Sequence, residues 1–373
     1  MSADDLAGYH ELLSQNALKL NDLWDQFPIN FQVIARSLDF AGSSASMGVA
    51  RDLICVDCDQ LDAILLCSIH SVHGNSCGVV PSYTSGLKLA EAFFRSVGDE
   101  VRVSACEDEN RFMLGKSKGL IPSGRFPGLA LSVFSQNGGI PTLLRAAAVY
   151  VLVHESAHIL LARGDKALGN LLSEIRKNVD IPEFAFDDRE KIYEAIVSGG
   201  TSRFTSGIVA EEVLCDYVAS LVVIRFLFRR FSNVLAALGF VRTLLNVTVM
   251  IARMKSELVR LNDVQTRYRI SERLTPSGQR FVTLAEILYN RRLEVFESIG
   301  QAGKSVSPVD RDYLLEEDWK NDFLDDAAFG LAMNSVAPAE KEDRYTYLSK
   351  HDGLSGSLTG LKFARDFVVS LYA

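Results

Sequence analysis

The chain of 373 residues is long enough to bury a large core, and its 48% hydrophobic and 23% charged content excludes disorder throughout. Its formal net charge of -8 argues against a nonspecific nucleic-acid or anionic-lipid ligand, because such contacts need clustered lysine and arginine. We therefore expect a folded protein that binds neither nucleic acid nor membranes.

The N-terminal sequence MSADDLAGYHELL is acidic and lacks the basic and apolar regions of a secretory signal. The apolar stretch 231–252 is interrupted by Arg242, so it predicts no membrane span. Six cysteines in a chain of this length without a signal are typical of reduced thiols. These features predict a cytoplasmic protein.

The first elements in chain order are predicted to be helical, with one short strand. Leucine-rich apolar faces predict helix in residues 1–40. A strand is expected over Leu53–Val56, followed by a helix that Asp57 or Asp59 caps and that ends near Gly74.

The next segments predict a second helix and then a small antiparallel sheet. The helix covers Leu87–Val97 and ends at Gly98. Alternating apolar residues at 101–105, a polar turn and an apolar run at 112–114 predict a β-hairpin. The stretch LALSVF at 129–134 predicts a third strand.

The rest of the chain predicts long helices. Pro141 suits the start of a helix and Gly164 suits its end, so residues 141–163 are expected to form one helix. A second apolar helix is expected over 208–228. Apolar residues at alternating spacings of three and four over 244–261 predict a packing seam, in the core or against a partner subunit.

These elements predict three regions. Residues 1–98 form a mainly helical N-terminal region, residues 99–300 form the catalytic core, and residues 301–373 form an acidic, helical C-terminal region.

The long helix carries the sequence HESAH at 154–158. Residues four apart lie on one helix face, so His154 and His158 can direct two imidazole nitrogens at one zinc ion. Glu155 lies one step around the helix, where its carboxylate can take a proton from water at the metal. The pattern predicts two ligands and a general base, although a buried helix can also carry it by chance.

The second apolar helix supplies carboxylates at the same spacing. Glu212 and Asp216 are four apart, and apolar residues surround Asp216. A buried carboxylate is costly unless it is paired or bound to a metal. We expect Glu212 as the third zinc ligand and Asp216 as the acceptor for the outer ring N–H of His154. The alternative is a solvent-facing strip of an amphipathic helix.

With these two motifs the sequence resembles the gluzincin metallopeptidases. The resemblance implies His154, His158 and Glu212 as zinc ligands, Glu155 as general base and Asp216 as orienting residue. It covers the organisation of roughly residues 100–230, but only the two motifs in sequence. A looser likeness is to soluble phage-exclusion peptidases of the Lit type, which also carry HExxH.

The resemblance also implies a fold. The class is α+β, mainly α and zincin-like, with a small antiparallel sheet packed on the HExxH helix and a helical second half. The sheet edge, expected at 129–134, would hold a peptide substrate in extended form beside the zinc.

Other residues near the motif are weaker candidates for the third ligand. The metzincin pattern is excluded, because Leu161 and Gly164 stand where its glycine and third histidine belong. Asp165 fits the start of a loop better than a ligand position. Glu211 remains an alternative third ligand. Only Glu212 lies four residues before Asp216, and this spacing is the one reason to prefer it.

A second cluster could bind a structural zinc. A CxxC pair opens the segment, but no second CxxC follows, and these cysteines also fit an apolar helix as small buried side chains. The cluster comprises Cys55, Cys58, Cys67, His70, His73 and Cys77.

The sequence thus predicts a zinc-dependent endopeptidase that acts on a protein or peptide substrate. The alternatives are a zinc hydrolase of a non-peptide bond and a catalytically silent interaction protein with a structural zinc. The group that polarises the carbonyl stays open among Tyr268, Arg280 and Tyr289.

Overall fold

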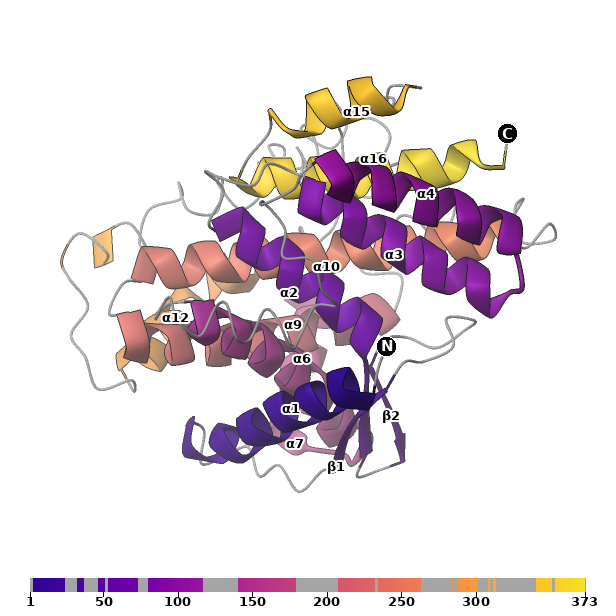
Figure 1. Ribbon diagram of the computed structural model, residues 1–373. Coiled ribbons are helices and arrows are strands. Elements are labelled where there is room, and N and C mark those ends of the chain that lie inside the picture. The colour runs from indigo at the N-terminus through magenta and orange to yellow at the C-terminus, as the bar shows by residue number, and fades with distance from the viewer. Residues whose placement is uncertain are drawn as a thin grey trace.

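A computed structural model of the chain describes residues 3–23, 32–36, 46–50, 53–72, 80–116, 140–178, 207–231, 234–262, 284, 287–300, 308, 311–312, 340–350 and 353–372. Within these residues the protein is mainly helical, with one small sheet (Figure 1). The elements in chain order are α1 (Ala3–Leu23), β1 (Gln32–Arg36), β2 (Ser46–Ala50), β3 (Leu53–Asp57), α2 (Cys58–Val72), α3 (Val80–Ser96), α4 (Glu100–Lys116), α6 (Ile140–Ala162), α7 (Lys166–Asn178), α9 (Gly207–Phe231), α10 (Val234–Asn262), α12 (Arg292–Gly300), α15 (Lys341–Leu348) and α16 (Gly353–Ser370).

The sheet has the strand order β1-β3-β2, with β1 parallel and β2 antiparallel to β3. The predicted strand at 53–56 is confirmed as β3, whose residues 54–57 are buried. The helix expected over 1–40 is confirmed only as α1. It was wrong at β1, where Val33 and Ile34 are β-branched residues that pair with β3.

The hairpin predicted over 101–114 was wrong, because these residues lie in helix α4. The alternation that suggested a strand includes Val101, which is 81% exposed, so it does not mark one buried face. The residues that α4 buries recur at helical spacing instead: Val103, Cys106, Glu109, Asn110 and Met113.

The start of α4 carries a clear helix signal. Gly98 has φ +74 after α3, and the Asp99 carboxylate accepts the Arg102 backbone N–H at 3.1 Å. A side-chain acceptor immediately before a helix satisfies one of its unpaired N–H groups. This cap favours a helix where the alternation suggested a strand.

The described residues therefore contain no antiparallel zincin-type sheet, and the predicted strand 129–134 lies outside them. The sheet that they do contain is mixed and lies between α1 and α2 in the chain, and β2 and β3 contact α6. The mainly helical class is confirmed.

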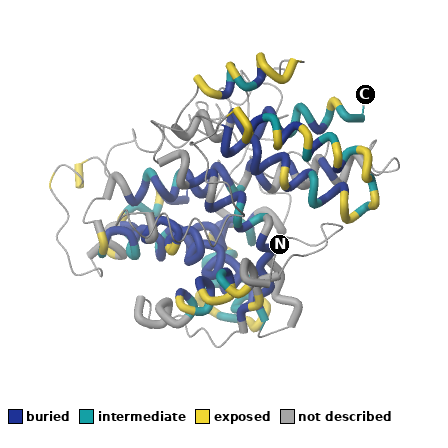
Figure 2. Tube along the Cα trace, in the orientation of Figure 1, coloured by how far each residue is buried: buried dark blue, intermediate teal, exposed yellow. Residues whose placement is uncertain are grey.

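Helices α6 and α9 pack extensively against each other in the centre of the molecule. Figure 1 shows them between two ends, one formed by α3, α4, α15 and α16 and the other by α1, α7 and the sheet. Most of both helices is buried (Figure 2). Side chains on their shared faces therefore lie in the interior of the protein.

The predicted bounds of α6 and α9 are close to those observed. Helix α6 begins at Ile140, one residue before Pro141, and Gly164 follows its end with φ +80. The Gly164 and Asp165 backbone N–H groups bond the Leu161 and Leu160 carbonyls, as in glycine-terminated helices.

Among the described residues, one helix is long and apolar enough to cross a membrane, the stretch Thr142–Ala162 of α6. Its apolar window is 78% buried inside the protein, and length and composition alone do not separate a membrane span from a core helix.

The seam predicted over 244–261 lies on α10, where Leu244, Val247, Ile251, Met254 and Leu258 are buried. One hydrophobic cluster extends from α1 to α16. The division into three regions stays a prediction.

Candidate metal centre

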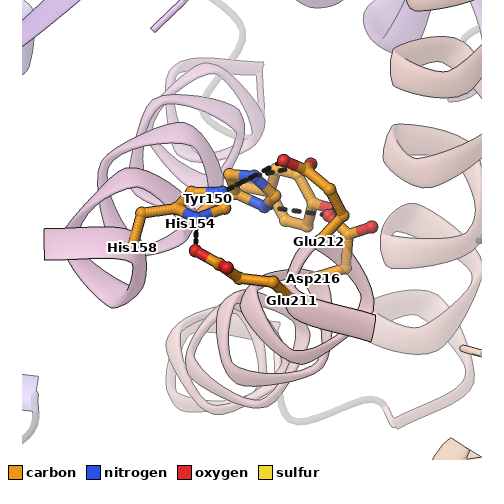
Figure 3. A network of polar contacts seen from close by, with 6 residues as sticks. All are labelled: Tyr150, His154, His158, Glu211, Glu212 and Asp216. Atoms are coloured by element: carbon orange, nitrogen blue, oxygen red, sulfur yellow. Dashed lines mark hydrogen bonds and ion pairs between the residues drawn. The ribbon is translucent and has the colours of Figure 1, made fainter. Parts of the chain in front are cut away.

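The candidate site lies where one face of α6 meets one face of α9. Helix α6 contributes His154 and His158, one turn apart, and α9 contributes Glu211, Glu212 and Asp216 (Figure 3). Successive α6 residues meet earlier and earlier α9 residues, so the two helices run antiparallel here. Helical spacing alone therefore brings the two sequence motifs together.

Three side chains converge on one point. The Nε2 atoms of His154 and His158 are 3.2 Å apart, and Glu212 oxygens lie 3.4 Å from the first and 3.3 Å from the second. Zinc binds such atoms at about 2.0–2.1 Å, so two ligands of a tetrahedral zinc lie about 3.3–3.4 Å apart. The two imidazole nitrogens thus have the spacing of two zinc ligands, and the Glu212 carboxylate offers one oxygen to each of them at a similar distance.

Among the described residues, this is the one group of histidine, cysteine and acidic side chains close enough to hold a metal ion. The group is His154, His158 and Glu212, the three residues predicted as ligands. The side chain of His154 is buried, whereas those of His158 and Glu212 are 25% and 30% exposed. The site therefore extends from the core to the surface.

A carboxylate also lies beside the other nitrogen of each imidazole. Asp216 Oδ1 is 2.9 Å from His154 Nδ1, and Glu211 Oε1 is 3.0 Å from His158 Nδ1. Such contacts fix the ring orientation and raise the basicity of the nitrogen that faces the metal. Asp216 thus lies beside His154, and its role as acceptor for the outer ring N–H of His154 stays a prediction.

Glu211, the rival ligand, has a different place. Its carboxylate contacts the outer nitrogen of His158, on the side of the ring away from the three converging atoms. Neighbouring positions on a helix point about 100° apart, so Glu211 and Glu212 approach the imidazoles from different sides. A role for Glu211 beside His158 was missed by sequence reasoning.

Tyr150 was also missed. Its hydroxyl donates a hydrogen bond to Asp216 Oδ1, and its ring stacks on His154 with centroids 6.2 Å apart. Its position one turn before His154 was the available signal, because α6 then presents three polar side chains on one face. Tyr150 holds the Asp216 carboxylate next to the His154 ring.

The carboxylates control the protonation of both histidines. Burial lowers the pKa of His154, but Asp216 and Glu212 outweigh it and raise this pKa to about 10. Burial also lowers the pKa of His158, whereas Glu212 and Glu211 raise it above its usual value despite opposition from His154. Without a metal, a proton is thus retained among these groups near neutral pH.

Glu155 is buried on α6, with 8% of its surface exposed. It lies close enough to Cys215 of α9 to contribute to raising the pKa of that thiol. It is not one of the three converging residues, in accord with a role other than ligand. Its role as general base stays a prediction.

The other candidate residues lie elsewhere or outside the described residues. Asp165 caps α7, where its carboxylate accepts the Leu168 N–H at 2.9 Å. Tyr289 lies under the guanidinium of Arg292. Tyr268 and Arg280 are outside the described residues.

The cysteine cluster is only partly described. Cys55 and Cys58 are buried, and burial raises the pKa of Cys67 to about 12, so its thiol stays protonated. This fits small buried side chains better than metal ligands. His73, Cys77 and the side chain of His70 lie outside the described residues.

A hollow of about 650 Å³ adjoins the site. It is bounded by the end of α6, the Gly164 turn, the start of α7 and Glu211 of α9. Since Glu211 also contacts His158, the hollow lies next to the candidate metal centre.

No protein-family model matches the chain, and no curated protein or solved structure shows significant similarity to it. The likeness to gluzincins therefore rests on the two short motifs and on the geometry of the side chains that they supply.

Proposed function

We propose that the protein is a zinc-dependent peptidase. The observation that carries the proposal is the convergence of His154, His158 and Glu212: the two Nε2 atoms are 3.2 Å apart, and each lies 3.3–3.4 Å from a different oxygen of the Glu212 carboxylate. Two imidazoles and one carboxylate form a donor set that zinc accepts, and catalytic zinc sites use three protein ligands and leave one position for water or substrate.

The proposed reaction is hydrolysis of a peptide bond. Zinc, when bound, supplies a Lewis acid that polarises the carbonyl and makes water more acidic. Glu155 accepts a proton from the attacking water, whose oxygen bonds to the carbonyl carbon. As the C–N bond breaks, Glu155 returns this proton to the leaving nitrogen, which gives an amine and a carboxylic acid that then loses its remaining proton to solvent.

The other residues position this machinery. Asp216, held by Tyr150, and Glu211 fix the two imidazole rings through their outer nitrogens. Fixed ligands need no reordering when the metal binds or when the reaction proceeds.

Two alternatives use the same metal group. A structural zinc is usually enclosed by four protein ligands, whereas this site has three, of which His158 and Glu212 are partly exposed. A hydrolase of a non-peptide bond would use the same residues, and the substrate assay described next separates it from a peptidase.

Glu155→Gln tests the mechanism against His158→Ala. We expect Glu155→Gln to keep one zinc per chain, measured by elemental analysis, while cleavage of a quenched fluorescent peptide library falls by about 10²- to 10⁴-fold. His158→Ala should lose zinc, activity and thermal stability together, because metal binding energy is also folding energy.

The results can contradict the proposal in three ways. Substantial peptide cleavage by Glu155→Gln would mean that Glu155 is not the base. Loss of zinc in that variant would make Glu155 a ligand. Wild-type protein that binds zinc and cleaves no library peptide would not be a peptidase.

A further inference from the structure

The hollow beside the metal centre is formed by residues that follow the ligand helix directly. Leu161 and Ala162 lie three and four residues after His158 and line it from α6. Glu211 lines it from α9 and contacts His158 at 3.0 Å. A group bound in the hollow would therefore lie beside Glu211, which contacts the proposed ligand His158.

The charged groups of the hollow differ in what they already bind. The Asp165 carboxylate accepts the Leu168 N–H, and the Glu211 carboxylate faces the His158 imidazole. For Lys166 and Asn170, which also line the hollow, the described part of the chain offers no side-chain partner. Both negative groups are thus engaged, and the positive group is available.

The two available groups act from the same side. Lys166 and Asn170 are four residues apart on α7, so an ammonium and an amide lie on one helix face. The Asp165 carboxylate already caps the first turn of α7, so Lys166 and Asn170 are the groups left for a ligand. An ammonium and an amide together favour a carboxylate over a neutral or cationic group.

We propose that this hollow binds a carboxylate of the substrate, and that Lys166 and Asn170 determine specificity for it. The inference rests on the proposed peptidase function and adds the substrate class: peptides with an acidic group near the bond that is cleaved. The carboxylate comes from an aspartate or glutamate side chain or from the C-terminus of the peptide.

The experiment uses the full-length, zinc-loaded protein and a library of peptides in which Glu, Gln or Lys occupies each position in turn. Each peptide is made as a free acid and as a C-terminal amide. Preference for Glu at one internal position in both forms identifies a side chain, whereas cleavage of the free acids alone identifies the C-terminus.

Two substitutions of Lys166 test the assignment. Lys166→Met should lower kcat/KM for the acidic peptides by about fivefold and leave the neutral peptides unchanged, as expected for one partly exposed ion pair. Lys166→Glu should reverse the preference, so that lysine is favoured over glutamate at the same position. Asn170→Ala should act in the same direction as Lys166→Met but more weakly.

Lys88→Met is the matched control, because Lys88 is an exposed lysine on α3, away from the hollow. It should leave the preference unchanged. The inference is overturned if wild type cleaves peptides without preferring the acidic ones, or if Lys166→Glu still prefers them. In both cases the peptidase function stands.

Binding separates the inference from turnover. Zinc-loaded Glu155→Gln should bind the labelled acidic peptides more tightly than the Gln peptides in fluorescence anisotropy, and a second substitution, Lys166→Glu, should remove this difference. Equal binding would overturn the inference whatever the turnover. Absence of cleavage by wild type would overturn the peptidase function instead.

Discussion

Two polar clusters of this protein, one buried and one that extends from the core to the surface, balance their negative charge in different ways. In the first, Glu109 of α4 is fully buried and meets Arg344 of α15 through two contacts of 2.8 and 2.9 Å. The Tyr83 hydroxyl donates a third bond to this carboxylate at 3.0 Å. A guanidinium is charged at every pH of interest, so the pair is permanent and links the C-terminal helices to α4.

In the second cluster, the carboxylates of α9 meet imidazoles instead. Every polar contact that the structure shows for His154 and His158 is with a carboxylate or with the other imidazole. An imidazole carries positive charge only while it is protonated, and it gives up its proton to bind a metal. The first cluster contains its own cation, whereas the second can exchange a proton for a metal ion.

The prediction with the largest expected effect tests whether the permanent Glu109–Arg344 ion pair stabilises the fold. Arg344→Met should lower the free energy of unfolding by about 3–5 kcal/mol, because it leaves the buried Glu109 carboxylate with only the half-exposed Lys341 ammonium nearby, at 3.9 Å. Chemical denaturation monitored by circular dichroism measures this loss. A chelator should not change it, and zinc content should stay at the wild-type level.

The matched control removes both charges. Glu109→Gln together with Arg344→Met should recover a large part of the lost stability, since no buried charge then lacks a partner. If Arg344→Met alone has no effect, the pair does not stabilise the fold and the contrast between the clusters fails.

The sequence predicted the second cluster far better than the first. Both motifs of the metal group lie on helices and repeat every fourth residue, so local spacing is enough to place their side chains on one face. By contrast, Glu109 and Arg344 are 235 residues apart, and no local pattern relates them. Their pairing depends on the tertiary packing of α15.

Local pattern was weakest at two points, one where the prediction of Glu212 over Glu211 was right and one where the prediction of a hairpin was wrong. Whether Glu211 or Glu212 faces the metal depends on the rotation of α9 against α6, which adjacent glutamates do not reveal. The segment 101–114 has alternation that fits a strand, but its cap at Asp99 and its burial pattern are helical. In both cases the outcome depends on which side of the helix faces the core, and a single sequence does not give that direction.

The second prediction compares the two carboxylates behind the imidazoles. Asp216→Asn should weaken zinc binding by about 10- to 100-fold, or about 1.4–2.7 kcal/mol, because the fixed orientation of His154 is lost. Glu211→Gln should weaken it less, since Glu211 is 39% exposed and water can replace it. Competition with a fluorescent zinc chelator measures both affinities.

Glu100→Gln, an exposed change on α4 with the same effect on net charge, is the control for this comparison. It should leave zinc affinity unchanged. Equal losses in all three variants would mean that net charge alone, and not orientation, governs binding.

The third prediction concerns how stability and zinc affinity depend on pH. Its effect is the smallest, about 1.4 kcal/mol in free energy for each proton and each pH unit. In the metal-free protein the carboxylates raise the pKa of His154 from 6.5 to about 10. A raised folded-state pKa contributes stability that is complete below pH 6.5 and is lost as pH rises through 10. Zinc needs the neutral imidazole, so its affinity should change in the opposite direction and increase with pH across this interval.

Calorimetry of zinc binding in two buffers of different ionisation enthalpy counts the protons released near neutral pH, and wild type should release at least one. Asp216→Asn removes the carboxylate that raises the pKa of His154 most, so this variant should release fewer protons and show a weaker pH dependence. An affinity independent of pH between about 6.5 and 8.5, with no proton release, would mean that His154 is already neutral. The second cluster would then hold no exchangeable cation, and its difference from the Glu109–Arg344 pair would need another explanation.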